Sequence, residues 1–127
     1  MVGWPELAEQ VRAVMATVPP DEQPRTVVLT ANYGEAGALE RFAPELRVSS
    51  GQNSYWLWGP PPEDTTTVVL VGFRTSAADR WCGSVTSAGT IANDAGLVND
   101  EAGRPLLICR DLRHPPGDLW ALVRHFD

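Results

Sequence analysis

The sequence predicts an α/β protein, a three-layer α/β/α sandwich around a mostly parallel sheet of four or five strands. Helical patterns alternate with short strand patterns along the chain, and the main strand patterns are continuous apolar runs. Such runs suit strands covered on both faces, and right-handed crossovers then place helices on both sides of the sheet. The 127 residues contain no internal repeat or long linker, so we expect one domain over residues 1–127.

The first half of the chain predicts two helices and two strands. Between Trp4 and Val18, apolar residues recur three and four positions apart, which is typical of an amphipathic helix. Thr26 to Thr30 is a β-branched run and predicts a buried strand. Gly34 to Phe42 is rich in Ala, Leu and Glu and predicts a helix. A second short strand is expected over Arg47 to Ser49.

The middle of the chain begins with a turn-rich, aromatic-rich stretch from Ser50 to Pro62, which we interpret as a loop with at most one helical turn. Thr66 to Gly72 is a continuous apolar run bounded by turn signals and predicts a strand. A short helix is expected over Ala77 to Trp81, and weak alternation over Val85 to Ala92 favours another strand.

The last part of the chain predicts one strand and one helix. The stretch from Asn93 to Arg104 is polar and contains glycine, which predicts a loop. Pro105 to Cys109 is expected to form the strand. After a turn at His114–Gly117, Asp118 to Phe126 predicts a helix with Asp118 as its N-cap.

Composition and charge exclude several classes of protein. The formal net charge is −6 and no run of basic residues could follow a phosphate backbone, so we expect no nucleic-acid partner. No stretch approaches the roughly 20 apolar residues that span a bilayer. Cys82 and Cys109 lack zinc-ligand spacing, so no metal is expected. They are either two buried thiols or one disulfide in an oxidising compartment, and the apolar setting of Cys109 favours thiols.

Two loops carry the candidate binding residues, because ligands of open α/β sheets lie beyond the carboxyl ends of the strands. Carboxamides, a carboxylate and aromatic rings together can bind a sugar through hydrogen bonds and ring packing. From residue types alone, loops that merely cover the edge of the core are the favoured alternative. The candidates are Asn32, Tyr33 and Glu35 after the first strand, and Gln52, Asn53, Tyr55, Trp56 and Trp58 after the second.

Motifs for catalysis and for nucleotide binding are missing from the sequence. Neither a GxSxG elbow nor a glycine-rich nucleotide fingerprint occurs, and we interpret His114 and His125 as structural. The carboxylates Asp94, Asp100 and Glu101 are interpreted as solvated charges of a polar loop. We therefore expect no cofactor and no catalytic residue.

Two strings of residues resemble a known family. Asn32 to Ala38 (NYGEAGA) and Ser50 to Pro60 (SGQNSYWLWGP) are similar to the carboxyl-terminal region of bacterial membrane glycosyltransferases, many of them actinobacterial. These belong to the protein O-mannosyltransferase and aminoarabinose-transferase superfamily. Shorter similarities extend over nearly the whole chain, at residues 3–7, 99–101, 103–105, 109–110 and 122–127. The family pattern usually has His where this chain has Gln52, which puts a role for that position as a base or metal ligand in doubt.

The resemblance implies a soluble extracytoplasmic domain that follows a bundle of membrane helices. Such enzymes transfer a sugar from a polyprenyl-phosphate donor, and their catalytic carboxylates lie in the membrane portion. We therefore expect this chain to be part of a larger membrane protein and to have no turnover alone. The implied partners are the membrane-embedded portion of the same polypeptide and a sugar or polyprenyl-phosphate headgroup.

Two alternatives stay open. The first is a free-standing α/β protein that binds a small, carbohydrate-type ligand. The second is a small α/β enzyme that uses Glu35 as a base, for which the sequence names no substrate.

Overall fold

The computed structural model describes residues 4–31, 33–46, 48–50, 63–90, 105–115 and 118. Helices and strands alternate over much of the chain, and a 3₁₀ turn (Gln23–Arg25) precedes the first strand. The elements are α1 (Trp4–Thr17), β1 (Thr26–Thr30), α2 (Tyr33–Phe42), β2 (Val48–Ser50), β3 (Thr67–Val71), α3 (Thr75–Trp81), β4 (Cys82–Thr90) and β5 (Pro105–Leu112).

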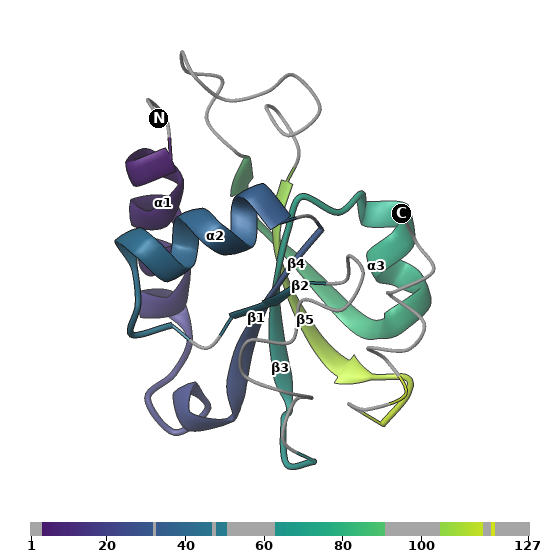
Figure 1. The fold of residues 1–127 in the computed structure, drawn as a ribbon. Helices are drawn as coiled ribbons and strands as arrows, with labels where there is room; N and C mark the ends of the chain where they lie inside the picture. Colours follow the sequence, from purple (N-terminus) through teal and green to yellow (C-terminus); the bar gives the residue numbers. More distant parts are fainter. Residues whose placement is uncertain are drawn as a thin grey trace.

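The strands form a five-stranded sheet in the order β2-β1-β3-β5-β4 (Figure 1). β1 pairs in parallel with β2 and β3, whereas β5 pairs antiparallel with β3 and β4. The α/β class is therefore confirmed, but the sheet is mixed rather than mostly parallel. The reason lies between β4 and β5, where the sequence offers a polar, glycine-containing stretch and no helical pattern. A parallel pair needs a long crossover, usually a helix, so the two consecutive strands pair antiparallel.

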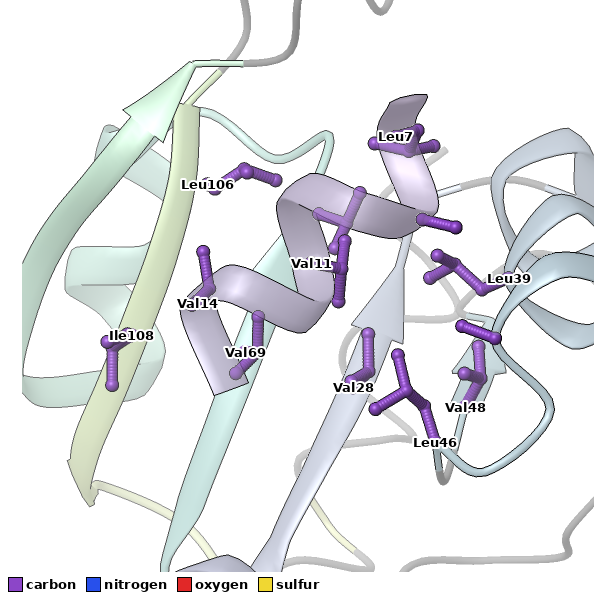
Figure 2. Close-up of a cluster of buried hydrophobic side chains, with 13 residues drawn as sticks. Leu7, Val11, Val14, Val28, Leu39, Leu46, Val48, Val69, Leu106 and Ile108 are labelled. Carbon is purple, nitrogen blue, oxygen red and sulfur yellow. The ribbon is translucent and has the colours of Figure 1, made fainter. Parts of the chain in front are cut away.

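Helices lie against both faces of the sheet, and each face has its own apolar cluster. In β1 and β3 successive side chains point to opposite faces, so Val28 and Val69 face α1 and α2 whereas Val27 and Val68 face away from them. Figure 2 shows the first cluster, in which Leu7, Val11 and Val14 of α1 lie over the sheet. The second cluster contains Ala77, Ala78 and Trp81 of α3, together with Leu29, Leu70, Phe73, Leu107 and both cysteines.

Most predicted elements are present with small shifts of their bounds. β1 has the predicted bounds, and β2 lies one residue later than expected. α3 begins at Thr75 rather than Ala77 because its first two residues are exposed and carry no apolar signal. The expected loops at 50–62 and 93–104 and the helix at 118–126 lie outside the described residues, apart from Ser50 at the end of β2 and Asp118.

Two strands are longer than predicted. β4 begins at Cys82, directly after α3, and β5 continues to Leu112. The additional residues of β5, Arg110 to Leu112, are half-buried or exposed, and those of β4 are the buried Cys82 and the exposed Gly83 and Ser84. In β5 the apolar run therefore marks only the buried section of the strand.

The two cysteines form a disulfide between β4 and β5, with their Cα atoms 5.5 Å apart. The sequence-based preference for free thiols is thus wrong. It rested on the apolar surroundings of Cys109, which is indeed fully buried. Local sequence could not show that Cys82 begins the neighbouring strand, because that pairing depends on the tertiary fold.

Candidate functional site

Three parallel strands end together at one edge of the sheet. Thr30, the last residue of β1, lies in register with Ser50 at the end of β2 and with Val71 at the end of β3. The backbone N–H of Ala31 continues this pairing by donating to the Val71 carbonyl at 3.0 Å. The chain therefore leaves β1, β2 and β3 at a common carboxyl edge, where α/β sheets bind ligands.

β4 ends and β5 begins at the same edge. The last residue of β4, Thr90, is paired with Pro105 at the start of β5, and Leu106 lies opposite Val71. Besides the turn after β3, three separate connections, residues 31–32, 51–66 and 91–104, thus begin at this edge. The mixed sheet consequently brings the third segment to the edge, a position that the sequence did not predict.

The predicted site residues can be placed only in part. Tyr33 and Glu35 belong to the first turn of α2, directly beyond the end of β1. The others lie outside the described residues. Asn32 stands between β1 and α2 in the sequence, and the rest follow the end of β2: Gln52, Asn53, Tyr55, Trp56 and Trp58. The Thr30–Ser50 pairing confirms that the two predicted loops start at one edge. The binding roles of their residues stay predictions.

The end of β3 contributes a tight turn and a cation to this edge. Gly72 has a φ of +88°, a conformation that a residue with a Cβ rarely adopts. Phe73 then turns inward and packs edge-to-face on Trp81, with ring centroids 5.3 Å apart. Arg74 follows as the exposed N-cap residue of α3. A guanidinium at this position can pair with a phosphate or carboxylate.

Arg74 was not among the residues selected from the sequence. The available signal was its position two residues after the glycine that ends the β3 pattern. A single cation at such a position is a weaker signal than the longer, aromatic-rich loops. Thr30 at the same edge is completely buried and belongs to the core rather than to a surface site.

An ion pair that is not part of the predicted site lies at the other end of the strands, where β1 and β3 begin. Arg110 Nε and Thr67 Oγ1 each donate to Glu22 Oε1 at 3.0 Å. The hydrogen bond from Arg110, followed by that from Thr67, lowers the pKa of the Glu22 carboxyl. Because these residues come from β5, β3 and the turn before β1, the cluster fixes that turn to the sheet.

A second charged group joins the two helices on the first face. Arg12 of α1 donates from Nε and Nη2 to the two carboxylate oxygens of Glu45, at 2.7 and 3.1 Å. Arg12 also pairs with Glu9, one turn earlier in the helix. The hydrogen bond from Arg12 lowers the pKa of Glu45. All three side chains are at least one-third exposed, so we interpret this group as a surface contact.

Neither a metal site nor a membrane span is found in the described part of the chain. No group of three or more histidine, cysteine or acidic side chains there could hold a metal ion. None of the helices in those same ranges is both long and apolar enough to cross a bilayer.

Comparison of the chain with known protein families, with curated proteins and with solved structures finds no match.

Proposed function

We propose that this chain is the extracytoplasmic domain of a membrane glycosyltransferase that uses a polyprenyl-phosphate-linked sugar. In this proposal the carboxyl edge contacts the acceptor, the donor headgroup or the membrane portion of the enzyme. The observation that carries it is the register of Thr30 with Ser50. The two strings that resemble the family, residues 32–38 and 50–60, directly follow or include these strand ends.

The chemistry of this edge suits a sugar phosphate. Carboxamides such as Gln52 and Asn53 can exchange hydrogen bonds with hydroxyl groups, and rings such as Trp56 can pack on the C–H face of a sugar. Arg74 adds a cation beside the same strand ends. A phosphate attached to the sugar would pair with such a group, as guanidinium groups commonly do.

The disulfide supports the proposed location. Disulfides persist in oxidising compartments and are rare in the cytosol, where thiols are kept reduced. Cys82 and Cys109 are bonded and almost fully buried, as expected for a structural disulfide. An extracytoplasmic domain would keep this bond throughout its lifetime.

Catalysis is assigned to the membrane portion, as the family resemblance implies. We expect no turnover and no cofactor in this chain alone. We also propose the three-layer sandwich that the sequence predicts, with α1 and α2 covering one face of the sheet and α3 the other.

The ligand role can be tested by heteronuclear NMR of the chain. We expect mannose 1-phosphate to shift the amide signals of residues 31–35, 51–58 and 72–75, and mannose alone to shift fewer of them. Arg74→Gln should weaken the response to the sugar phosphate while leaving the response to mannose unchanged. The matched control is Arg25→Gln, which removes an exposed cation near the opposite edge.

Each result bears on a different part of the proposal. Shifts confined to the carboxyl edge support a sugar-recognising role, whereas shifts spread over the sheet contradict it. If neither compound causes a shift, the edge does not bind the sugar, and contact with a membrane portion is the part that remains to be tested.

The gene sequence tests whether this chain belongs to a membrane protein. A reading frame that continues upstream through apolar spans of about 20 residues supports the membrane portion. A stop codon directly upstream contradicts it and favours the free-standing binding protein.

A further inference from the structure

β4 is the last strand on its side of the described sheet, and its outer edge is open. Eight of its nine residues are uncharged and not buried: Gly83, Ser84, Thr86, Ser87, Gly89 and Thr90 are exposed, and Val85 and Ala88 are half-buried. No strand in the described part of the chain therefore pairs with the backbone groups on the outer side of β4.

Exposed edge strands usually carry protection against pairing with another chain, such as charged side chains, proline or a bulge. β4 contains no charged residue and no proline. Its carboxyl end is protected, because the pairing with β5 is irregular between Ser87 and Thr90 and because Gln10 Nε2 donates to the Thr90 carbonyl at 2.7 Å. The segment that stays open is Gly83 to Ser87.

The neighbouring helix leaves this segment uncovered. A groove of about 440 Å³ separates α1 from β4, with Gln10, Ala13 and Thr17 on the helix side and Thr86, Ser87 and Ala88 on the strand side. Among the described residues that line the groove, none has a charged side chain. An additional strand can thus approach the outer edge of β4 without displacing α1.

We propose that β4 pairs antiparallel with β4 of a second copy of this chain, around a twofold axis near Val85. Backbone hydrogen bonds would then join the two sheets into one. The open segment is compatible with such self-pairing, because it brings no like charges into opposition and its side chains are small. The inference does not depend on the proposed glycosyltransferase role.

The unequal lengths of the two outermost strands, β2 and β4, favour a closed dimer over an open chain of molecules. β2, at the other edge, has only three residues, whereas β4 has nine. A β4–β2 contact would be short and would repeat without closing, whereas a β4–β4 contact uses the same surface twice and closes at two copies. The predicted assembly is therefore a dimer and nothing larger.

Sedimentation equilibrium tests this proposal on the unmodified chain and two variants. Ser84→Lys/Thr86→Lys places two cations on one face of β4. The twofold axis can pass through position 84, 85 or 86. In each case at least one lysine of one copy lies directly opposite a lysine of the other copy. Ala16→Lys/Thr66→Lys adds the same charge at exposed positions away from β4. We expect the unmodified chain and the control to dimerise at high concentration, and the β4 variant to remain monomeric.

Hydrogen exchange provides a second measurement. Outward-facing amides of residues 83–87 should exchange more slowly at high than at low protein concentration, and this difference should vanish in the β4 variant. A native far-ultraviolet circular dichroism spectrum shows that the variant is folded. A monomer at all concentrations, assembly beyond two copies, or a dimer that persists in the β4 variant would each overturn the proposal.

Discussion

The backbone of Gly83 in β4 lies so close to Asp111 in β5 that a Cβ added to the glycine would be 2.8 Å from the Asp111 Cβ. It would also lie 3.1 Å from the Asp111 carbonyl oxygen. Asp111 itself has a φ of +53°, which is unfavourable for a residue with a side chain. The two strands thus meet at a point where one residue must be glycine and the other adopts a strained conformation.

Gly83→Ala should therefore destabilise the protein by about 1 to 3 kcal/mol, as expected when a methyl group is forced into a filled space. Asp111→Gly should instead stabilise it by roughly 1 kcal/mol, because glycine adopts a positive φ without steric cost. In the double variant the cost of Gly83→Ala should fall, since the Cβ it meets is gone. Urea unfolding measures all three. Equal costs of Gly83→Ala in both backgrounds would contradict a contact with the Asp111 side chain.

The Cys82–Cys109 disulfide should contribute strongly to stability. It joins residues separated by 27 positions, and closing a loop of that size in the unfolded chain corresponds to about 3 to 4 kcal/mol. We expect Cys82→Ala/Cys109→Ala to lose about this amount, measured by urea unfolding without reductant. Dithiothreitol should lower the stability of the unmodified protein and leave the variant unaffected. An unchanged unfolding midpoint in the variant would show that the bond adds no stability.

Glu22 should make the stability of the protein depend on pH. Its pKa is lowered in the folded state, first by the hydrogen bond from Arg110 and then by that from Thr67. The ionised carboxylate therefore stabilises the folded state at pH values above the ordinary glutamate pKa of about 4.3. This contribution is lost as the pH falls through the lower folded-state value.

Glu22→Gln should accordingly reduce the free energy of unfolding at pH 7, and the difference from the unmodified protein should shrink at acidic pH. Denaturant unfolding at several pH values measures this difference. Glu63→Gln, which removes an exposed carboxylate shortly before β3, is the control for loss of charge. A difference that stays constant down to pH 3 would exclude a role for the ionised Glu22.

Patterns within one element were sufficient to predict most of the fold. β1 was predicted with its observed bounds because Thr26 to Thr30 are all buried and mostly β-branched. The spacing of Leu7, Val11 and Val14 likewise identified α1, since these residues form its buried face. Both signals reflect burial along a single segment.

Contacts between distant segments could not be predicted in this way. The position of β5 between β3 and β4 depends on pairing across the sheet, and so does the disulfide. The ion pair between Glu22 and Arg110 joins residues 88 positions apart. For the candidate site, the sequence predicted that two loops share an edge, and the pairing of Thr30 with Ser50 confirms it. Arg74 was missed because a single exposed arginine has no distinctive pattern.

Two neighbouring threonines near the start of β3 should respond in opposite ways to the same substitution. Thr65 is 5% exposed, and its Oγ1 has no hydrogen-bond partner in the described part of the protein. Thr67 is 1% exposed, but its hydroxyl donates to Glu22 at 3.0 Å. Valine has nearly the shape of threonine, so replacing either residue isolates the effect of the hydroxyl group.

Thr65→Val should raise the free energy of unfolding by about 1 kcal/mol, because it removes a buried polar group that is not hydrogen-bonded. Thr67→Val should lower it by about 1 kcal/mol or more, because the hydroxyl then lost donates to a charged acceptor. Urea unfolding of the two variants, side by side with the unmodified protein, measures both signs. If Thr65→Val is destabilising, its hydroxyl has a partner in solution, whereas a neutral Thr67→Val would show that Arg110 alone satisfies Glu22.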